Sequence, residues 1–69
     1  MSDFVGLAPR ERDCLKLLAV GLRPEEIANR LGIGFRSVDK YINSARRKLK
    51  ATTRDQVVVR ALMLKLIHL

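Results

Sequence analysis

The feature that most constrains this chain is the stretch 31–50, in which a glycine-containing turn precedes a long amphipathic segment. At about 100° per residue, a helix over residues 35–50 has one apolar side, formed by Val38, Ile42, Ala45 and Leu49, with Tyr41 at its edge. The opposite side, which we call the basic ridge, is formed at i, i+4, i+7 and i+11 by Arg36, Lys40, Asn43 and Arg47. These side chains can donate hydrogen bonds to phosphates or to base edges. The stretch therefore predicts a helix that enters a DNA groove.

The positive charge of the chain is concentrated on the same stretch. The net charge is +7, and residues 34–54 contribute +6 of it, because seven Lys and Arg side chains there accompany Asp39 alone. Residues 1–33 carry five basic and five acidic side chains and are neutral overall. Charge gathered on one segment of a folded domain is typical of a protein that binds a polyanion. A merely solvated charged face is the alternative interpretation.

The length and the cysteine content limit the kinds of protein that this chain can be. With 69 residues it is expected to form one domain, 1–69, in which residues 1–6 are a flexible arm. Cys14 is the only cysteine, which excludes an internal disulfide and a multi-cysteine zinc site and fits a reducing compartment. No apolar run approaches the roughly 20 residues that span a bilayer, and no signal-peptide pattern is present. We therefore expect a cytoplasmic protein without a membrane partner, either free-standing or part of a longer regulator.

Two shorter helices are predicted before the amphipathic one. The first runs from Pro9 to about Val20, lacks a capping side chain at Ala8, and ends at Gly21, which tolerates a positive φ. Its inward face is formed by Glu11, Cys14, Leu15 and Leu18. The second spans residues 24–31 and stops at Gly32, after which Ile33 returns to the core. A short helix, a glycine turn and a second amphipathic helix are the outline of a helix-turn-helix, so the predicted fold class is all-α.

A fourth helix is predicted to begin at Thr53, which can form a capping box with Gln56, and to continue to Ile67 or His68. One stripe of this helix is expected to pack on the core: Val57, Val58, Ala61 and Leu64. A second apolar stripe lies on the other side and is formed by Val59, Leu62, Met63 and Leu66. Because one helix cannot bury both faces in so small a domain, the second stripe predicts a dimer interface with a second copy of the chain.

Together these segments resemble the LuxR-type helix-turn-helix DNA-binding domain, which also occurs in response regulators of the NarL/FixJ type. The resemblance covers Leu7 to about Ile67 and rests on four segments: L-A-P-R-E-R-D-C-L-K-L-L at 7–18, G-L-R-P-E-E-I-A-N-R-L-G-I at 21–33, S-V-D-K-Y-I at 37–42 and R-K-L at 47–49. The apolar end of the fourth helix looks most like the quorum-sensing branch. The resemblance implies four helices, of which the third is a recognition helix in the major groove and the fourth mediates dimerisation.

The resemblance also implies roles for individual residues. Base-contacting positions of the family match Asp39, Lys40 and Asn43, with Arg36 close to DNA, and phosphate-contacting positions match Arg23, Ser37, Tyr41 and Lys48. The chain departs from the family pattern in four places: Asp39 stands where lysine is common, Gly34 replaces a capping serine, Arg23-Pro24 replaces a Ser-Asn-type pair, and Tyr41 stands where histidine is frequent. These departures leave the operator sequence open.

The chemistry of the ridge agrees with base readout. Asn43 can pair with adenine through two hydrogen bonds, and Arg36 or Lys40 can donate to guanine N7 and O6. Asp39 can accept from cytosine N4, can orient Arg36 or Asn43 through a side-chain contact, or can be a solvated charge without a role on DNA.

The predicted function is sequence-specific transcription regulation by a dimer on double-stranded DNA, with RNA polymerase as a further candidate partner. No enzyme activity, cofactor or small-molecule site is expected, because the chain has no Gly-rich phosphate loop, no Ser/His/Asp set and no paired carboxylates in a cleft. His68 is the only histidine, so no metal site is expected. Two alternatives remain open: region 4 of a sigma factor, and an anti-activator that sequesters a related regulator through its fourth helix.

Overall fold

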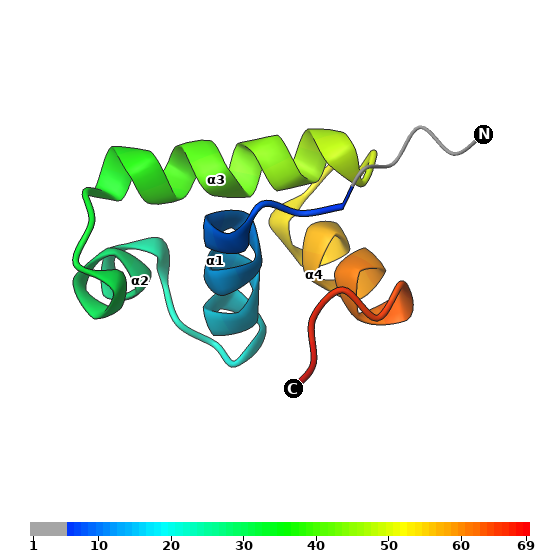
Figure 1. Ribbon diagram of the computed structural model, residues 1–69, viewed down its shortest axis with the longest axis horizontal. Helices are drawn as coiled ribbons and strands as arrows, with labels where there is room; N and C mark the ends of the chain where they lie inside the picture. Colours follow the sequence, from blue (N-terminus) through cyan, green and yellow to red (C-terminus); the bar gives the residue numbers. More distant parts are fainter. Residues whose placement is uncertain (1–5) are drawn as a thin grey trace.

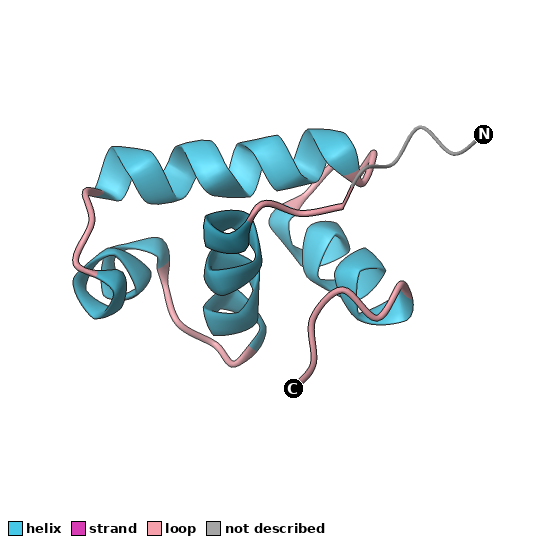
Figure 2. Cartoon of the chain, viewed as in Figure 1, coloured by secondary structure: helices cyan, strands magenta, loops and turns pink. Residues whose placement is uncertain are grey.

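The computed structural model describes residues 6–69, which form four helices and no strand. They are α1 (Pro9–Ala19), α2 (Pro24–Leu31), α3 (Phe35–Lys48) and α4 (Arg54–Met63). The long α3 runs along one side of the molecule, α1 lies beneath it, and α2 and α4 lie on either side of α1 (Figure 1). Short loops join the helices (Figure 2). The predicted all-α, four-helix fold is confirmed, whereas residues 1–5 of the predicted arm lie outside the described residues.

The start of α1 and the end of α2 follow local chemistry. Ala8 offers no capping side chain to α1, but the Glu11 Oε1 atom accepts a hydrogen bond from the Ala8 amide at 2.8 Å. This bond is the carboxylate half of a capping box. Gly32 ends α2 in the left-handed region at φ 67°, and the following Ile33 amide donates to the Ala28 carbonyl at 3.0 Å. The glycine turn predicted between the two helices is therefore present.

The apolar face of α3 is the one that helical spacing predicts. Three side chains of the helix are buried in the core: Val38, Ile42 and Ala45. Leu49, just after the helix, is also buried, and Tyr41 is partly buried at the edge of this face. The helix ends at Lys48, two residues before the predicted end, because Lys50 adopts a left-handed φ of 54°. The Ala51 amide then donates to the Arg46 carbonyl at 2.9 Å and closes the turn.

The core consists of two clusters that α1 and α3 share. The first joins α1, the end of α3, α4 and the C-terminal segment, with Leu7, Leu15, Ala45, Leu49, Ala51, Val57, Ala61 and Ile67. The second joins α1, α2 and the first half of α3, with Cys14, Ile27, Ala28, Val38 and Ile42. As expected for the first helix, the Cys14 thiol is fully buried, and burial together with the nearby Asp13 charge raises its pKa. Cys14 therefore acts as a small apolar side chain.

The predicted end of the fourth helix is wrong. Helix α4 stops at Met63 because Lys65 takes a left-handed φ of 59°, and the Leu66 amide donates back to the Ala61 carbonyl at 2.8 Å. This turn directs Ile67 into the core, where it is 2% exposed. At the start of the helix, one half of the predicted capping box is present, since Thr53 Oγ1 accepts from the Gln56 amide at 3.2 Å. The Gln56 Oε1 atom accepts from the Thr52 amide at 2.7 Å and not from the Thr53 amide.

The early stop of α4 changes which residues lie on which face. Leu64, predicted to pack on the core, is 57% exposed. Leu62 and Leu66, predicted to lie on the outer stripe, are partly buried against the first cluster. Of the predicted outer stripe, Val59 and Met63 are exposed as expected. The outer apolar surface therefore consists of Val59, Met63 and Leu64.

Candidate nucleic-acid interface

The basic ridge lies on the side of α3 that faces away from the core. Arg36, Lys40 and Arg47 are exposed, and Asn43 is partly buried. Asp39, the one carboxylate of this helix, is exposed beside them. Because the opposite side of the helix is packed on α1, α2 and α4, the ridge is the face of α3 that remains available to a ligand.

A second row of polar side chains runs along the flank of α3, between the ridge and the core. At i, i+4, i+7 and i+11, it consists of Ser37, Tyr41, Ser44 and Lys48, all partly buried. Together with ridge residues and α1, this flank forms a shallow polar depression lined by Glu11, Ser37, Lys40, Tyr41, Ser44 and Arg47. Four of the predicted DNA contacts, Ser37, Lys40, Tyr41 and Arg47, are thus brought together. Arg23, at the N-terminus of α2, is exposed but does not line the depression.

Glu11 is a buried carboxylate that connects α1 to α3. It is 4% exposed and accepts three hydrogen bonds, from the Ala8 amide at 2.8 Å, from Ser44 Oγ at 2.5 Å and from Lys48 Nζ at 2.8 Å. A buried carboxylate is tolerated when donors and an opposite charge surround it. These bonds fix the flank of α3 against the first turn of α1, and they therefore set the direction in which the basic ridge points.

The environment of Glu11 favours its charged form. Burial alone would raise the pKa of this carboxyl, but the bonds from Lys48, Ser44 and the Ala8 amide, with the Lys48 charge, lower the pKa below its ordinary value. The Lys48 ammonium is correspondingly committed to an internal ion pair, and its side chain is 31% exposed. The assignment of Lys48 as a phosphate contact stays a prediction.

Asp39, Asn43 and Arg46 are linked by hydrogen bonds along α3. The Asn43 amide nitrogen donates to Asp39 Oδ2 at 3.3 Å, and Arg46 Nε donates to the Asn43 amide oxygen at 3.4 Å. Of the roles that the sequence left open for Asp39, orientation of Asn43 by a side-chain contact is the one present here.

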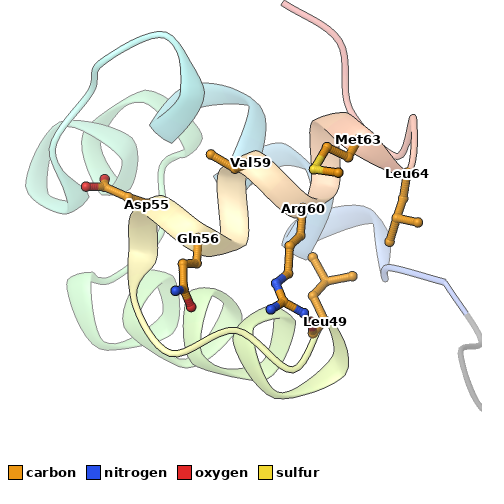
Figure 3. A pocket seen from close by; sticks show the side chains of 7 residues that line it. All are labelled: Leu49, Asp55, Gln56, Val59, Arg60, Met63 and Leu64. Carbon is orange, nitrogen blue, oxygen red and sulfur yellow. Dashed lines mark hydrogen bonds between the residues drawn. The ribbon is translucent and has the colours of Figure 1, made fainter.

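A separate apolar groove lies on the outer side of α4. It is lined by Leu49, Asp55, Gln56, Val59, Arg60, Met63 and Leu64. Figure 3 shows these side chains, with Arg60 extending from α4 toward Leu49. Arg60 Nη1 donates to the Leu49 carbonyl at 3.1 Å, which satisfies an acceptor where α3 ends. The apolar residues of the groove include two members of the predicted dimer stripe, Val59 and Met63.

Between residues 6 and 69, no group of three or more His, Cys, Asp or Glu side chains could hold a metal ion. No helix in the same range is long and apolar enough to cross a membrane.

Sequence reasoning placed Glu11 on the inward face but did not assign it a role, and it did not single out Ser44. The available signal was a carboxylate among apolar side chains on one helix, together with a polar row at helical spacing on another. Nothing in the sequence states that these two rows meet, because Glu11 is separated from Ser44 by 33 positions and from Lys48 by 37.

The arrangement defines a class of protein. A short helix, a glycine turn and a second helix that carries an exposed basic ridge form a helix-turn-helix DNA-binding domain.

Comparisons with known proteins identify the family. The profile of "Bacterial regulatory proteins, luxR family" matches residues 5–61. The chain is 42% identical over 59 residues to the transcriptional activator protein RaiR of Rhizobium etli, covering 84% of this chain and 24% of RaiR. It is 42% identical over 57 residues to the nitrate/nitrite response regulator NarL of Escherichia coli K12, covering 83% of this chain and 26% of NarL. The chain belongs to the LuxR family of bacterial regulatory proteins.

Solved structures agree with this assignment. The transcription factor GerE superposes with a TM-score of 0.86 at 27% identity, covering 90% of this chain and 92% of GerE. One chain of a Vibrio cholerae VqmA dimer superposes with a TM-score of 0.85 at 34% identity, covering 93% of this chain and 29% of the VqmA chain. The chain spans about a quarter of the length of the curated relatives named above.

Proposed function

We propose that this domain directs a transcription regulator to specific operators by placing α3 in the major groove of double-stranded DNA. The observation that carries the proposal is the exposed basic ridge of Arg36, Lys40, Asn43 and Arg47 on the one face of α3 that the core leaves uncovered. In this arrangement the base contacts come from Lys40 and Asn43 and from the nearby Arg36, and Asp39 accepts a hydrogen bond from Asn43 beside them. The proposed site of action is the chromosome in the cytoplasm.

The backbone contacts are proposed to come from the flank of α3 and the start of α2. Ser37 and Tyr41 line the polar depression with Lys40 and Arg47, so hydroxyl donors and two cations face one hollow. Arg23 extends from the N-terminus of α2, where the helix dipole also favours an anion. Phosphate contacts supply affinity that depends on salt but not on sequence.

The controlling signal is proposed from the relatives. VjbR of Brucella abortus, 40% identical over 63 residues, is described as a quorum sensing-dependent transcriptional regulator. On this basis the domain is proposed to belong to a quorum-sensing regulator, with RNA polymerase as a candidate partner at the promoter. The 69 residues themselves are assigned the DNA contact and not the detection of the signal.

Binding measured against salt tests the groove proposal. We expect fluorescence anisotropy with a sequence enriched from a random double-stranded library to show saturable binding that weakens roughly 100-fold between 50 and 200 mM salt, as neutralisation of about four phosphates requires. We expect Asn43→Ala to relax specificity at one base pair and Arg23→Ala to weaken binding to all sequences alike. Absence of binding at 50 mM salt would contradict the proposal and favour a protein-sequestering role.

Dimerisation through the outer face of α4 is the second part of the proposal. Val59, Met63 and Leu64 are 52%, 75% and 57% exposed and line one apolar groove, a surface that a second copy of the same helix would cover. Two recognition helices roughly 34 Å apart would then meet successive turns of the groove. Two of the residues predicted for the dimer interface, Leu62 and Leu66, are partly buried in the protomer's own core. The proposed contact therefore centres on Met63.

We expect Met63→Asp to abolish self-association and to reduce binding to a two-fold site while leaving binding to an isolated half-site unchanged. The side chain is 75% exposed, so the fold should tolerate the charge. Sedimentation velocity and anisotropy on the two DNAs provide the measurements, and Leu69→Asp, at an 82% exposed position outside α4, is the matched control. Equal sedimentation of the wild type and both variants would remove the dimer contact from the proposal.

A further inference from the structure

The hydrogen bonds on the basic ridge constrain the orientation of one amide group. The Asn43 amide nitrogen faces the Asp39 carboxylate, toward the start of α3, and the amide oxygen faces Arg46 Nε, toward its end. Asp39 can only accept hydrogen bonds and the guanidinium of Arg46 can only donate them. A 180° flip of the amide would place acceptor against acceptor on one side and donor against donor on the other. The two neighbours therefore select one of the two amide orientations.

Enough hydrogen-bonding capacity remains on Asn43 for a base. The side-chain amide has two N–H donors and an oxygen with two lone pairs, and Asp39 and Arg46 occupy one of each. One donor and one acceptor are left, in a fixed order along the helix. In the major groove, adenine presents N7 as an acceptor beside N6–H as a donor, and the order of the two reverses when the A·T pair is inverted to T·A.

We propose that Asp39 is a positioning residue that, with Arg46, fixes the Asn43 amide so that the domain distinguishes A·T from T·A at one operator position. This inference rests on the proposed placement of α3 in the major groove. Asp39 thereby determines specificity without touching the base. Its negative charge weakens attraction to every phosphate, so the residue lowers affinity for all DNA while sharpening the choice of strand on which adenine is read.

The test compares one protein on paired DNAs, which cancels the general effect of charge. An operator is enriched from a random double-stranded library, and the base pair whose preference Asn43→Ala abolishes is identified. Affinity is then measured with A·T, T·A, G·C and C·G at that pair. For the wild type we expect about tenfold or stronger preference for one orientation of the A·T pair, as for other bidentate contacts.

For the double variant Asp39→Ala/Arg46→Ala, we expect that orientation preference to fall to about twofold or less, because no neighbour then selects one amide orientation. Each single variant keeps one of the two neighbours, so its ratio should lie between that of the double variant and that of the wild type. The preference for A·T and T·A over the G·C pairs should persist. Asp13→Ala is the matched control: it removes a carboxylate from α1 that forms only a surface ion pair with Arg10, so general affinity can rise but the orientation ratio should not change.

A measurement without DNA tests the same contact directly. In ¹⁵N-labelled protein, we expect the side-chain amide signals of Asn43 to shift in Asp39→Ala toward those of the exposed Asn29, which serves as the internal reference. Unchanged Asn43 signals, or an enriched operator with the same orientation ratio in Asp39→Ala as in the wild type, would overturn the inference alone. Failure to enrich any sequence would overturn the groove-binding function and the inference with it.

Discussion

We expect Ile67→Ala to lower the free energy of unfolding by about 2–5 kcal/mol, the largest effect of any single truncation near the C-terminus. Ile67 is 2% exposed and packs in the cluster that joins α1, α3 and α4. Truncation of this side chain leaves a cavity where side chains from three separate helices meet. Urea unfolding followed by circular dichroism is the measurement.

A domain of this size has a total stability of roughly 3–10 kcal/mol, so Ile67→Ala can be largely unfolded. Ile67→Val, expected to cost about 0.5–1.5 kcal/mol, keeps the test quantitative. Leu69→Ala, at an 82% exposed position, is the control and should be nearly neutral. Equal stabilities of Ile67→Ala and Leu69→Ala would mean that the chain after Met63 does not return to the core.

We expect Glu11→Gln to lower the free energy of unfolding by about 1–3 kcal/mol at pH 7, because it weakens three hydrogen bonds and leaves the Lys48 charge without its partner. The loss should depend on pH. Since the interactions of Glu11 lower its pKa in the folded state, the folded protein holds that proton less tightly than the unfolded chain. The stabilisation is therefore complete above the unfolded pKa of about 4.3 and is lost as the pH falls through the folded-state value.

The difference in stability between the wild type and Glu11→Gln should thus shrink when unfolding is measured at pH 3 rather than pH 7. Asp13→Asn supplies the comparison, since the Arg10–Asp13 pair is exposed and such pairs contribute little. If the difference in stability were the same at both pH values, the charge of Glu11, and with it the ion pair with Lys48, would not contribute to the free energy of unfolding.

The parts of the fold that follow from local patterns were predictable. Val38, Ile42 and Ala45 recur at helical spacing, so the inner face of α3, and with it the exposed ridge, follows from the sequence. The end of α2 at Gly32 was equally predictable, because glycine adopts a left-handed conformation at little cost. These two features predict the helix-turn-helix.

The end of α4 was not predictable in the same way. A lysine, not a glycine, takes the left-handed conformation at residue 65, and its sequence neighbours match a continuing apolar helix. Burial of Ile67 offsets the unfavourable backbone conformation. Tertiary packing thus overrides the local pattern and reassigns Leu62, Leu64 and Leu66 between the core and the surface.

The contacts of Glu11 were not predictable for another reason. Helical spacing says which side chains of one helix share a face, but it does not say which faces of two helices meet. The Glu11–Lys48 pair joins the first turn of α1 to the last turn of α3. The same limit applies to Asn43: its neighbours at i−4 and i+3 could be foreseen, but the direction of its amide could not.

The division of the core into two clusters has a consequence for how events at one end of the domain reach the other. Helices α2 and α4 do not pack against each other, and each packs on both α1 and α3. Any energetic coupling between a molecule seated on α4 and the turn that precedes α3 must therefore pass through these two shared helices. Amide hydrogen exchange should accordingly show two regions that open independently, one around α2 and one around α4, while α1 and α3 exchange more slowly.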